Sequence, residues 1–273
     1  LHLPAHGRGR ALAPGLQQLL RGGGASWDLP ELPEIGGPLE PEGAVAEAQA
    51  AAAALLGAQR CWFGVNGASG LLQSALLALT SPGQRLLLPR NLHRSLLHGC
   101  LLGQLRPVLF DLPFDAATGL WLPPTPALLA AALDQALAAG PLAAVVLVSP
   151  SYQGLVGDLA GLIAVAHGRG LPVLLDEAHG AHLGLDPRLP PSGLAAGADL
   201  VVPLANQDPL RLALPTAPLG INGLEADAWL LPRGVIAELP EPGCLSFCLG
   251  LKPPRGLERR LPRRLLQLRA ALG

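Results

Sequence analysis

The chain has 273 residues, of which 50% are hydrophobic and 14% are charged, and its net charge is −1. This composition supports a substantial core in one large domain or two modest ones, and it provides no field that attracts nucleic acid or an acidic membrane. No apolar run reaches the roughly 18 residues of a membrane span. The N-terminus has no apolar segment of the signal-peptide type. We therefore expect a cytoplasmic protein without nucleic-acid or membrane partners.

Three residue types add to this expectation. The four cysteines show no metal-type pairing, so we expect buried free thiols. The sequence contains no methionine, and we expect it to be trimmed or partial. Its single lysine is Lys252, and the position of this residue becomes important below.

Residues 1–43 are rich in proline and glycine and are expected to form an extended arm. After them, short apolar runs alternate with segments rich in alanine and leucine, which is typical of parallel βαβ units with right-handed crossovers. Helices are predicted over residues 47–56, 71–79, 128–139 and 159–169, with another ending at residue 102. Strands are predicted over residues 60–65, 85–89, 107–110, 143–148, 173–175 and 198–202.

From residue 203 onward, prolines interrupt the alternation of apolar runs and helical segments. A helix over residues 224–231 and strands over residues 235–239 and 244–249 predict a small α+β unit. Leucines in residues 255–272 are spaced as in an amphipathic helix. The arginines between them indicate a solvated basic face rather than a nucleic-acid site.

The candidate site lies in residues 171–182, where a buried strand leads into Asp176, Glu177, His179 and His182. In open α/β sheets, ligands bind outside the carboxyl ends of the strands. A buried carboxylate and buried imidazoles are costly to desolvate, so they require partners. This end of the strand is therefore where chemistry is expected.

Several interpretations of this segment are possible. The letters DEAH at residues 176–179 match a helicase box, but that requires an upstream GxxxxGK[ST] loop, and the only lysine is far downstream. A metal site built from Asp176, His179 and His182 lacks a recognised zinc spacing. Local helix capping by the Asp and His side chains is the third interpretation.

The fourth interpretation is a pyridoxal phosphate site. Asp176 could pair with a protonated ring nitrogen, and His93 could stack on the ring. The small-residue turn at residues 66–70 precedes a helix, where free N–H groups and the dipole favour an anion, although a plain βα turn has the same pattern. The residues that could hold a phosphate there are Gly67, Ala68 and Ser69, with His179 nearby.

Five motifs resemble those of the Orn/Lys/Arg decarboxylase family and occur in the family's order across residues 1–202. They are LPAHGRG at 3–9, EPEG at 40–43 leading into EAQ, NGASG at 66–70, PRNLHRS at 89–95 and DEAHGAH at 176–182. Residues 220–223 and 234–238 resemble the family's C-terminal domain more loosely.

The resemblance implies an α/β protein of fold type I that depends on pyridoxal phosphate, with a mostly parallel sheet and flanking helices in its large domain. It divides the chain into an N-terminal arm (1–43), an incomplete cofactor-binding large domain (44–205) and a small α+β C-terminal domain (209–273). It also implies a homodimer, or a dimer with a paralogue.

The resemblance further implies a role for each matching residue. Asp176 would hold the pyridinium proton, His93 would stack on the ring and assist protonation, and Ala178 would back the other ring face. Ala68 and Ser69, with Gly67, would bind the phosphate, and His179 would complete the catalytic set. The reaction implied is α-decarboxylation of arginine, lysine or ornithine to an amine, without a metal.

The sequence departs from the family where the Schiff-base lysine is expected, in a Ser-x-His-Lys segment shortly after the strand at 198–202. Residues 203–208 contain neither lysine nor histidine. We interpret this as an internal deletion that also removes a strand and a helix, which would leave a gap or an exposed sheet edge.

Lys252 is expected to be a peripheral surface lysine that does not replace the missing one. The cofactor would then be held non-covalently at best, and decarboxylation would be impaired. The alternatives are a non-catalytic cofactor-binding or regulatory paralogue and a gene fragment.

Overall fold

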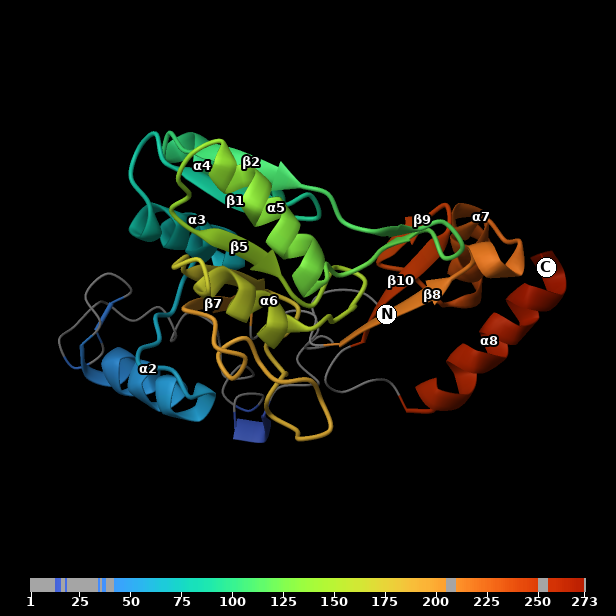
Figure 1. Cartoon of the computed structure of the whole chain (residues 1–273). Coiled ribbons are helices and arrows are strands. Elements are labelled where there is room, and N and C mark those ends of the chain that lie inside the picture. The colour runs from blue at the N-terminus through green and yellow to red at the C-terminus, as the bar shows by residue number, and fades with distance from the viewer. Residues whose placement is uncertain are drawn as a thin grey trace.

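A computed structural model describes residues 13–15, 18, 34, 36–37, 42–204, 210–249 and 255–272. Most of the expected N-terminal arm and Lys252 lie outside these described residues. The described chain forms two β-sheet units, drawn from blue to orange and from orange to red in Figure 1.

A five-stranded sheet in the order β2-β1-β5-β6-β7 forms the centre of the first unit, and all its strand pairs are parallel. The predicted strands are confirmed to within two residues in this sheet. Its strands are β1 (Arg85–Pro89), β2 (Arg106–Phe110), β5 (Val145–Val148), β6 (Val173–Glu177) and β7 (Leu200–Pro203).

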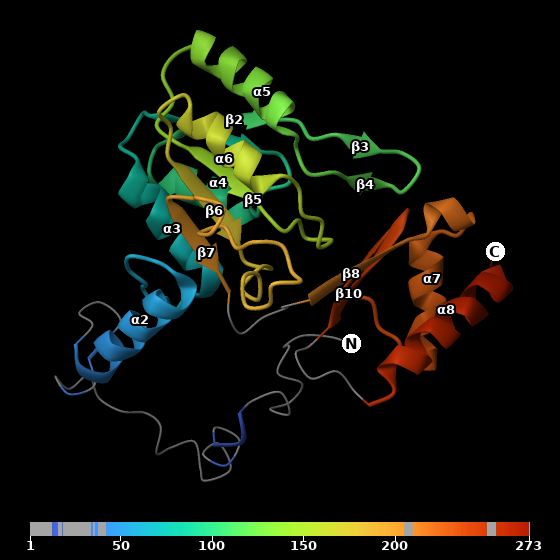
Figure 2. The same cartoon turned by 60° about the horizontal axis from the view of Figure 1, so that its bottom comes forward.

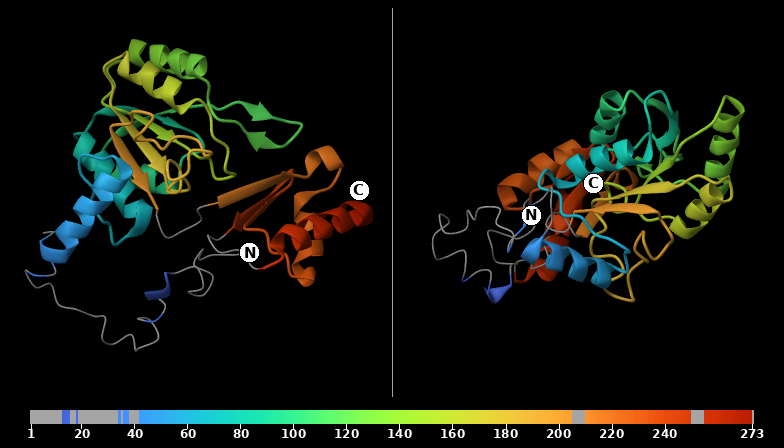
Figure 3. Two further views of the ribbon diagram at one scale, coloured as in Figure 1. Left: turned by 90° about the horizontal axis from the view of Figure 1, so that it is seen from below. Right: turned by 90° about the vertical axis from the view of Figure 1, so that its left-hand side faces the viewer.

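Helices cover both faces of this sheet. The α3 and α4 helices lie on one face, and α5 and α6 lie on the other (Figures 1 and 3). Strands buried on both faces read as continuous apolar runs, which is why their prediction succeeded. The helices of this unit are α2 (Gly43–Leu56), α3 (Gly67–Leu79), α4 (Arg94–Leu102), α5 (Pro126–Ala138) and α6 (Leu159–His167).

Alternation along β6 sends successive side chains to opposite faces. Leu174 packs in the core shared with α3 and α4, whereas Leu175 packs in the core shared with α5 and α6. Asp176 therefore belongs to the face of α3 and α4, and Glu177 belongs to the opposite face.

The strand predicted over residues 60–65 is wrong, because this segment is irregular. Its large side chains are exposed, with Trp62 at 57%, Phe63 at 45% and Val65 at 79%. Apolar composition here does not mark a buried strand. Helix α3 also begins four residues earlier than predicted, at Gly67.

A short hairpin, β3 (Phe114–Asp115) with β4 (Leu120–Trp121), was not predicted. Its turn is stabilised by Asp115, whose carboxylate accepts hydrogen bonds from the Ala117 N–H (2.9 Å) and the Thr118 hydroxyl (2.7 Å). The hairpin extends toward the second unit (Figure 2), and its Gly119 lies against Gly243 there.

The second unit is an antiparallel sheet in the order β8-β10-β9 packed against helices α7 and α8. Strand β8 was not predicted, and the strand predicted at 235–239 is wrong because β9 begins only at residue 239. The elements are β8 (Leu210–Pro215), η2 (Ala217–Leu219), α7 (Gly223–Leu230), η3 (Leu231–Arg233), β9 (Leu239–Glu241), β10 (Cys244–Leu249) and α8 (Leu257–Leu272).

Strand β7 is the last strand at one edge of the parallel sheet. Among the described residues its only strand partner is β6, in register from Leu200 to Pro203. The free edge of β7 therefore leaves backbone groups without a strand partner in this part of the chain. None of the helices in the described ranges is long and apolar enough to cross a membrane.

Candidate functional site

Asp176 is the buried carboxyl group of the site, at the carboxyl end of β6. The strand holds it between Val148 of β5 and Val202 of β7, and only 4% of the residue is exposed. One carboxylate oxygen accepts the Ala178 N–H at 3.2 Å. Burial raises the pKa of Asp176, and the Ala178 N–H and the charge of His93 oppose that rise. Asp176 is therefore suited to a cationic N–H partner.

His93 approaches Asp176 from the N-terminus of α4. Its backbone is extended, and its Nδ1 accepts the Ser95 N–H at 3.3 Å and lies 2.8 Å from the Ser95 hydroxyl. The imidazole is thus both the cap of α4 and an exposed ring at the carboxyl edge of the sheet. These two contacts fix the orientation of the ring.

The N-terminus of α3 provides backbone donors on the same face of the sheet. The helix begins at Gly67 with φ of +62°, and its first backbone bond runs from the Gly70 N–H to the Asn66 carbonyl at 3.4 Å. The N–H groups of Gly67, Ala68 and Ser69 precede that bond, and the Asn66 side chain does not cap them. This arrangement favours an anion.

Three further polar atoms are buried at this edge without a hydrogen-bond partner among the described residues. They are Asn91 Oδ1 after β1, Ser149 Oγ after β5 and His182 Nδ1 after β6. Leaving such an atom unsatisfied costs about 1–3 kcal/mol, which indicates that the edge accommodates water or a polar ligand. Asn91 and Ser149 were not predicted as site residues, although both lie at the carboxyl ends of buried strands, as Asp176 does.

His179 contacts the second unit. The Arg211 guanidinium of β8 lies 3.5 Å from His179 Nδ1, and the Tyr152 ring meets the imidazole edge-on with 5.3 Å between centroids. The same guanidinium stacks over the Tyr152 ring at 4.2 Å. Arg211 was missed because it lies on a strand that was not predicted. No sequence signal joins it to the motif at 176–182.

Glu177 has a structural role on the opposite face. It is 3% exposed, and its carboxylate accepts the Gly193 N–H at 2.7 Å, which ties the segment after β6 back to the sheet. Burial raises the pKa of Glu177 to about 7, and the Gly193 N–H partly offsets the rise. The second acidic residue of the motif therefore anchors a loop.

The structure does not gather Asp176, His179 and His182 as a metal site. Within the described ranges, no group of three or more His, Cys, Asp or Glu side chains could hold a metal ion. The local-capping interpretation is also incomplete, because within the described residues the buried Asp176 carboxylate accepts a hydrogen bond from the Ala178 N–H alone.

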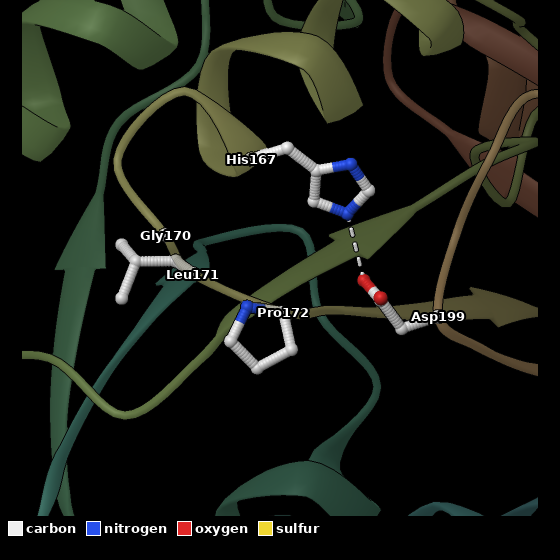
Figure 4. A pocket seen from close by; sticks show the side chains of 5 residues that line it. All are labelled: His167, Gly170, Leu171, Pro172 and Asp199. Atoms are coloured by element: carbon white, nitrogen blue, oxygen red, sulfur yellow. Dashed lines mark hydrogen bonds and ion pairs between the residues drawn. The ribbon is translucent and has the colours of Figure 1, made fainter.

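A cavity of about 330 Å³ lies at the other edge of the sheet, lined by His167, Gly170, Leu171, Pro172 and Asp199 (Figure 4). Here the Asp199 carboxylate contacts His167 Nε2 and accepts the Val173 N–H, each at 2.8 Å. Asp199 thus fixes the beginning of β6. The cavity is at the amino ends of the strands, whereas Asp176 lies at the carboxyl end of β6.

The fold is that of fold-type-I proteins, a parallel sheet between two helix layers. The crystal structure of the SepCysS–SepCysE N-terminal domain complex is similar, with a TM-score of 0.57 and 14% identity over 95% of this chain and 57% of that chain. The likeness concerns the fold alone.

Residues 2–204 match the family model described as Orn/Lys/Arg decarboxylase, major domain. The chain belongs to the Orn/Lys/Arg decarboxylase family. An arginine decarboxylase of Halalkalibacterium halodurans and one of Bacillus subtilis are each 30% identical over 200 residues, which cover 73% of this chain and 40% of the relative. An uncharacterized Bacillus subtilis protein, YaaO, is 38% identical over 181 residues, which cover 66% of this chain and 37% of the length of YaaO.

The chain spans about two fifths of the length of the curated arginine decarboxylases that it matches. Family and fold imply pyridoxal phosphate as the cofactor. The residues fit the groups that bind the cofactor non-covalently, because a buried carboxyl, an imidazole that caps α4 and the N-terminus of α3 share one face of the sheet. The described residues include no lysine for covalent attachment.

Proposed function

We propose that this chain binds pyridoxal phosphate non-covalently at the carboxyl edge of its parallel sheet, and that its decarboxylation of basic amino acids is impaired. The observation that carries the proposal is the buried Asp176, on the face of the sheet where His93 caps α4 and α3 begins. The sequence offers Lys252 as its single amine side chain.

In this proposal Asp176 binds the pyridinium N–H, which relieves the cost of its own burial. His93 lies against the ring, and Ala178 backs the opposite face. The N–H groups of Ala68 and Ser69, with that of Gly67, bind the phosphate. When bound, the cofactor supplies an electron sink for the carbanion left by carbon dioxide.

The substrate proposed is arginine, lysine or ornithine, in accordance with the family and with the relatives named arginine decarboxylase. Without a Schiff-base lysine, exchange of the substrate amine onto the cofactor loses its usual route. The second candidate is a non-catalytic cofactor-binding or regulatory protein that pairs with a lysine-bearing paralogue. The same missing lysine favours it.

The test is to titrate the purified chain with pyridoxal phosphate, follow cofactor absorbance, and then reduce with borohydride and map modified lysines by mass spectrometry. We expect saturable binding that dialysis removes, with no specific label. Stoichiometric labelling of Lys252, or amine production from any of the three amino acids, would contradict the impaired-activity proposal. Absence of any saturable binding would contradict the cofactor proposal itself.

A dimer is proposed as the assembled form. The exposed side chains of Trp62, Phe63 and Val65 lie close together in the chain before α3, where a second copy or a paralogue could cover them. Sedimentation velocity tests this: we expect a dimer that a W62S/F63S double variant weakens. A monomer at all concentrations, with no paralogue co-purifying, contradicts it.

A cytoplasmic location is proposed from the cysteines. All four lie within the described residues and none of them forms a disulfide bond; three are buried and Cys61 is half-buried. Free thiols persist in reducing compartments. Fractionation of cells that express the tagged chain tests this, and recovery outside the cytoplasm would contradict it.

A further inference from the structure

Three side chains from separate segments meet beside the motif at 176–182. Tyr152 follows β5, His179 follows β6, and Arg211 lies on β8, beyond the residues that match the family model. All three pairs are in contact. Arg211 Nη2 lies 3.5 Å from His179 Nδ1, Arg211 Cζ lies 4.2 Å from the centroid of the Tyr152 ring, and the centroids of the Tyr152 and His179 rings are 5.3 Å apart. The second unit therefore reaches the candidate site.

A guanidinium group can only donate hydrogen bonds. In its contact with His179, Arg211 Nη2 is therefore the donor and Nδ1 of the imidazole is the acceptor. A neutral imidazole that accepts at Nδ1 carries its proton at Nε2. The other ring nitrogen then becomes a donor.

We propose that Arg211 is a positioning residue that fixes the tautomer and orientation of His179, so that the Nε2–H donates to an anionic oxygen of the bound cofactor. This inference deepens the proposed function and rests on it. Arg211 acts through His179, and His179 contacts the ligand.

The guanidinium is held in place from two sides. It stacks on the Tyr152 ring, and the Tyr152 hydroxyl donates to the Glu238 carboxylate of the second unit at 3.3 Å. Gly154, with φ of +86°, allows β8 to lie close: a Cβ at this position would be 2.8 Å from Arg211 Cβ. The turn after β5 is therefore shaped to receive this strand.

A further contact fixes the second unit against the first. The Gln153 amide donates to the Glu241 carboxylate at 3.1 Å, next to the Tyr152–Glu238 bond. Both bonds pair the turn after β5 with residues on or beside β9. Together these two hydrogen bonds keep β8 next to His179.

The first experiment uses the full chain without cofactor. Nitrogen-15 NMR of histidine-labelled protein, recorded where imidazoles are neutral and assigned with an H179Q variant, reports which ring nitrogen of His179 is protonated. We expect the proton on Nε2 and a hydrogen-bonded Nδ1. The R211L variant should shift the Nδ1 signal and mix the tautomers, and R211K should restore part of the shift. A proton on Nδ1 in the unmodified chain, or identical spectra for R211L, overturns the proposal.

The second experiment is a double-mutant cycle on cofactor affinity. We expect R211L to weaken pyridoxal phosphate binding about tenfold, because His179 would lose the hydrogen bond that orients it toward the cofactor. In an H179A background, R211L should have no further effect. If the tenfold loss persists there, Arg211 contacts the cofactor directly and the positioning role is wrong.

Two controls separate the possible failures. R233L removes an arginine of the second unit that stacks instead on Trp229 at 3.8 Å, and it should leave cofactor affinity unchanged. H179Q retains a donor near the place of Nε2 and should bind better than H179N; the reverse order contradicts the inference. If no variant and no parent chain binds cofactor, the proposed function fails, whereas the NMR result still decides the tautomer.

Discussion

A carboxylate at the amino ends of the parallel strands, here called the amino edge, has a different environment from one at their carboxyl ends, the carboxyl edge. At the amino edge, Asp199 is half-exposed, and His167 and the Val173 N–H satisfy it. At the carboxyl edge, Asp176 is 4% exposed and accepts a hydrogen bond from the Ala178 N–H. Asn91 Oδ1 and Ser149 Oγ, which follow neighbouring strands, have no hydrogen-bond partner among the described residues. The amino ends of the strands are thus satisfied by the chain's own groups, whereas the carboxyl ends leave buried polar atoms that water or a polar ligand can satisfy.

The pKa directions follow this difference. Burial raises the pKa of Asp176 and Glu177 at the carboxyl edge. At the amino edge, burial raises the pKa of Asp199, but the Val173 N–H and His167 outweigh it, so the net shift is downward. The two edges should therefore depend on pH with opposite signs.

The largest expected effect is on stability through Glu177. Its pKa is about 7 in the folded chain against 4.5 as the reference, so the folded state binds more protons than the unfolded state between these values. Stability should fall as pH rises from about 4.5 to 7, by about 3 kcal/mol. Urea unfolding at several pH values should show a flatter slope for E177Q, which retains the acceptor for Gly193. An unchanged slope would contradict the buried carboxyl.

The amino edge provides the matched control for that measurement. Because the folded pKa of Asp199 is lowered, its contribution is present above its unfolded pKa of 3.8 and is lost as pH falls. D199N should change the free energy of unfolding only at acidic pH, and it should leave the slope of that free energy between pH 4.5 and 7 unchanged. If D199N flattens that slope as E177Q does, the contrast between the edges fails.

The next effect in size is on cofactor binding. D176N removes the charge that would meet the pyridinium N–H, and we expect a loss of about 1.5–3 kcal/mol, or about 10- to 150-fold in affinity. Absorbance titration measures it. D199N should bind as the parent does, and equal losses in both variants would place the effect in stability rather than in the site.

A smaller effect is expected at the phosphate position. G67A places a Cβ at φ of +62°, where it meets Leu204 Cδ1 at an ordinary contact distance of 4.0 Å, so its cost is backbone strain of about 1 kcal/mol. G57A carries the same strain at φ of +70°, at the end of α2. Both should lower the melting temperature alike, but only G67A should weaken binding of inorganic phosphate or cofactor. Identical binding in the two variants would contradict the phosphate site.

The smallest effect concerns Tyr152, the only tyrosine in the chain. Burial raises its pKa, Arg211 lowers it, and Glu238 raises it. Ultraviolet titration of tyrosinate should therefore show a lower midpoint in E238Q and a higher one in R211L. No movement in either variant would mean that the second unit is not docked on this turn.

Sequence analysis predicted the parallel sheet well because its strands are buried on both faces and read as unbroken apolar runs. Asp176 was found for the same reason, as a carboxylate directly after such a run. Residues 60–65 show the limit of that logic, because Trp62 and Phe63 are apolar yet exposed.

The C-terminal unit was predicted less well. Strand β8 contains Arg211 and ends at Pro215, and it is recognised as a strand only through its pairing with β10. The role of Arg211 beside His179 depends on a contact between residues 32 positions apart, which no local pattern encodes. Long-range docking, rather than propensity, determines this part of the site.

The open edge of β7 has a practical consequence for handling the protein. Within the described ranges β7 pairs with β6 alone, and a strand edge that has no strand partner is a template onto which another extended chain can add. Added strands extend the sheet without a natural stopping point, so soluble yield should fall steeply with concentration.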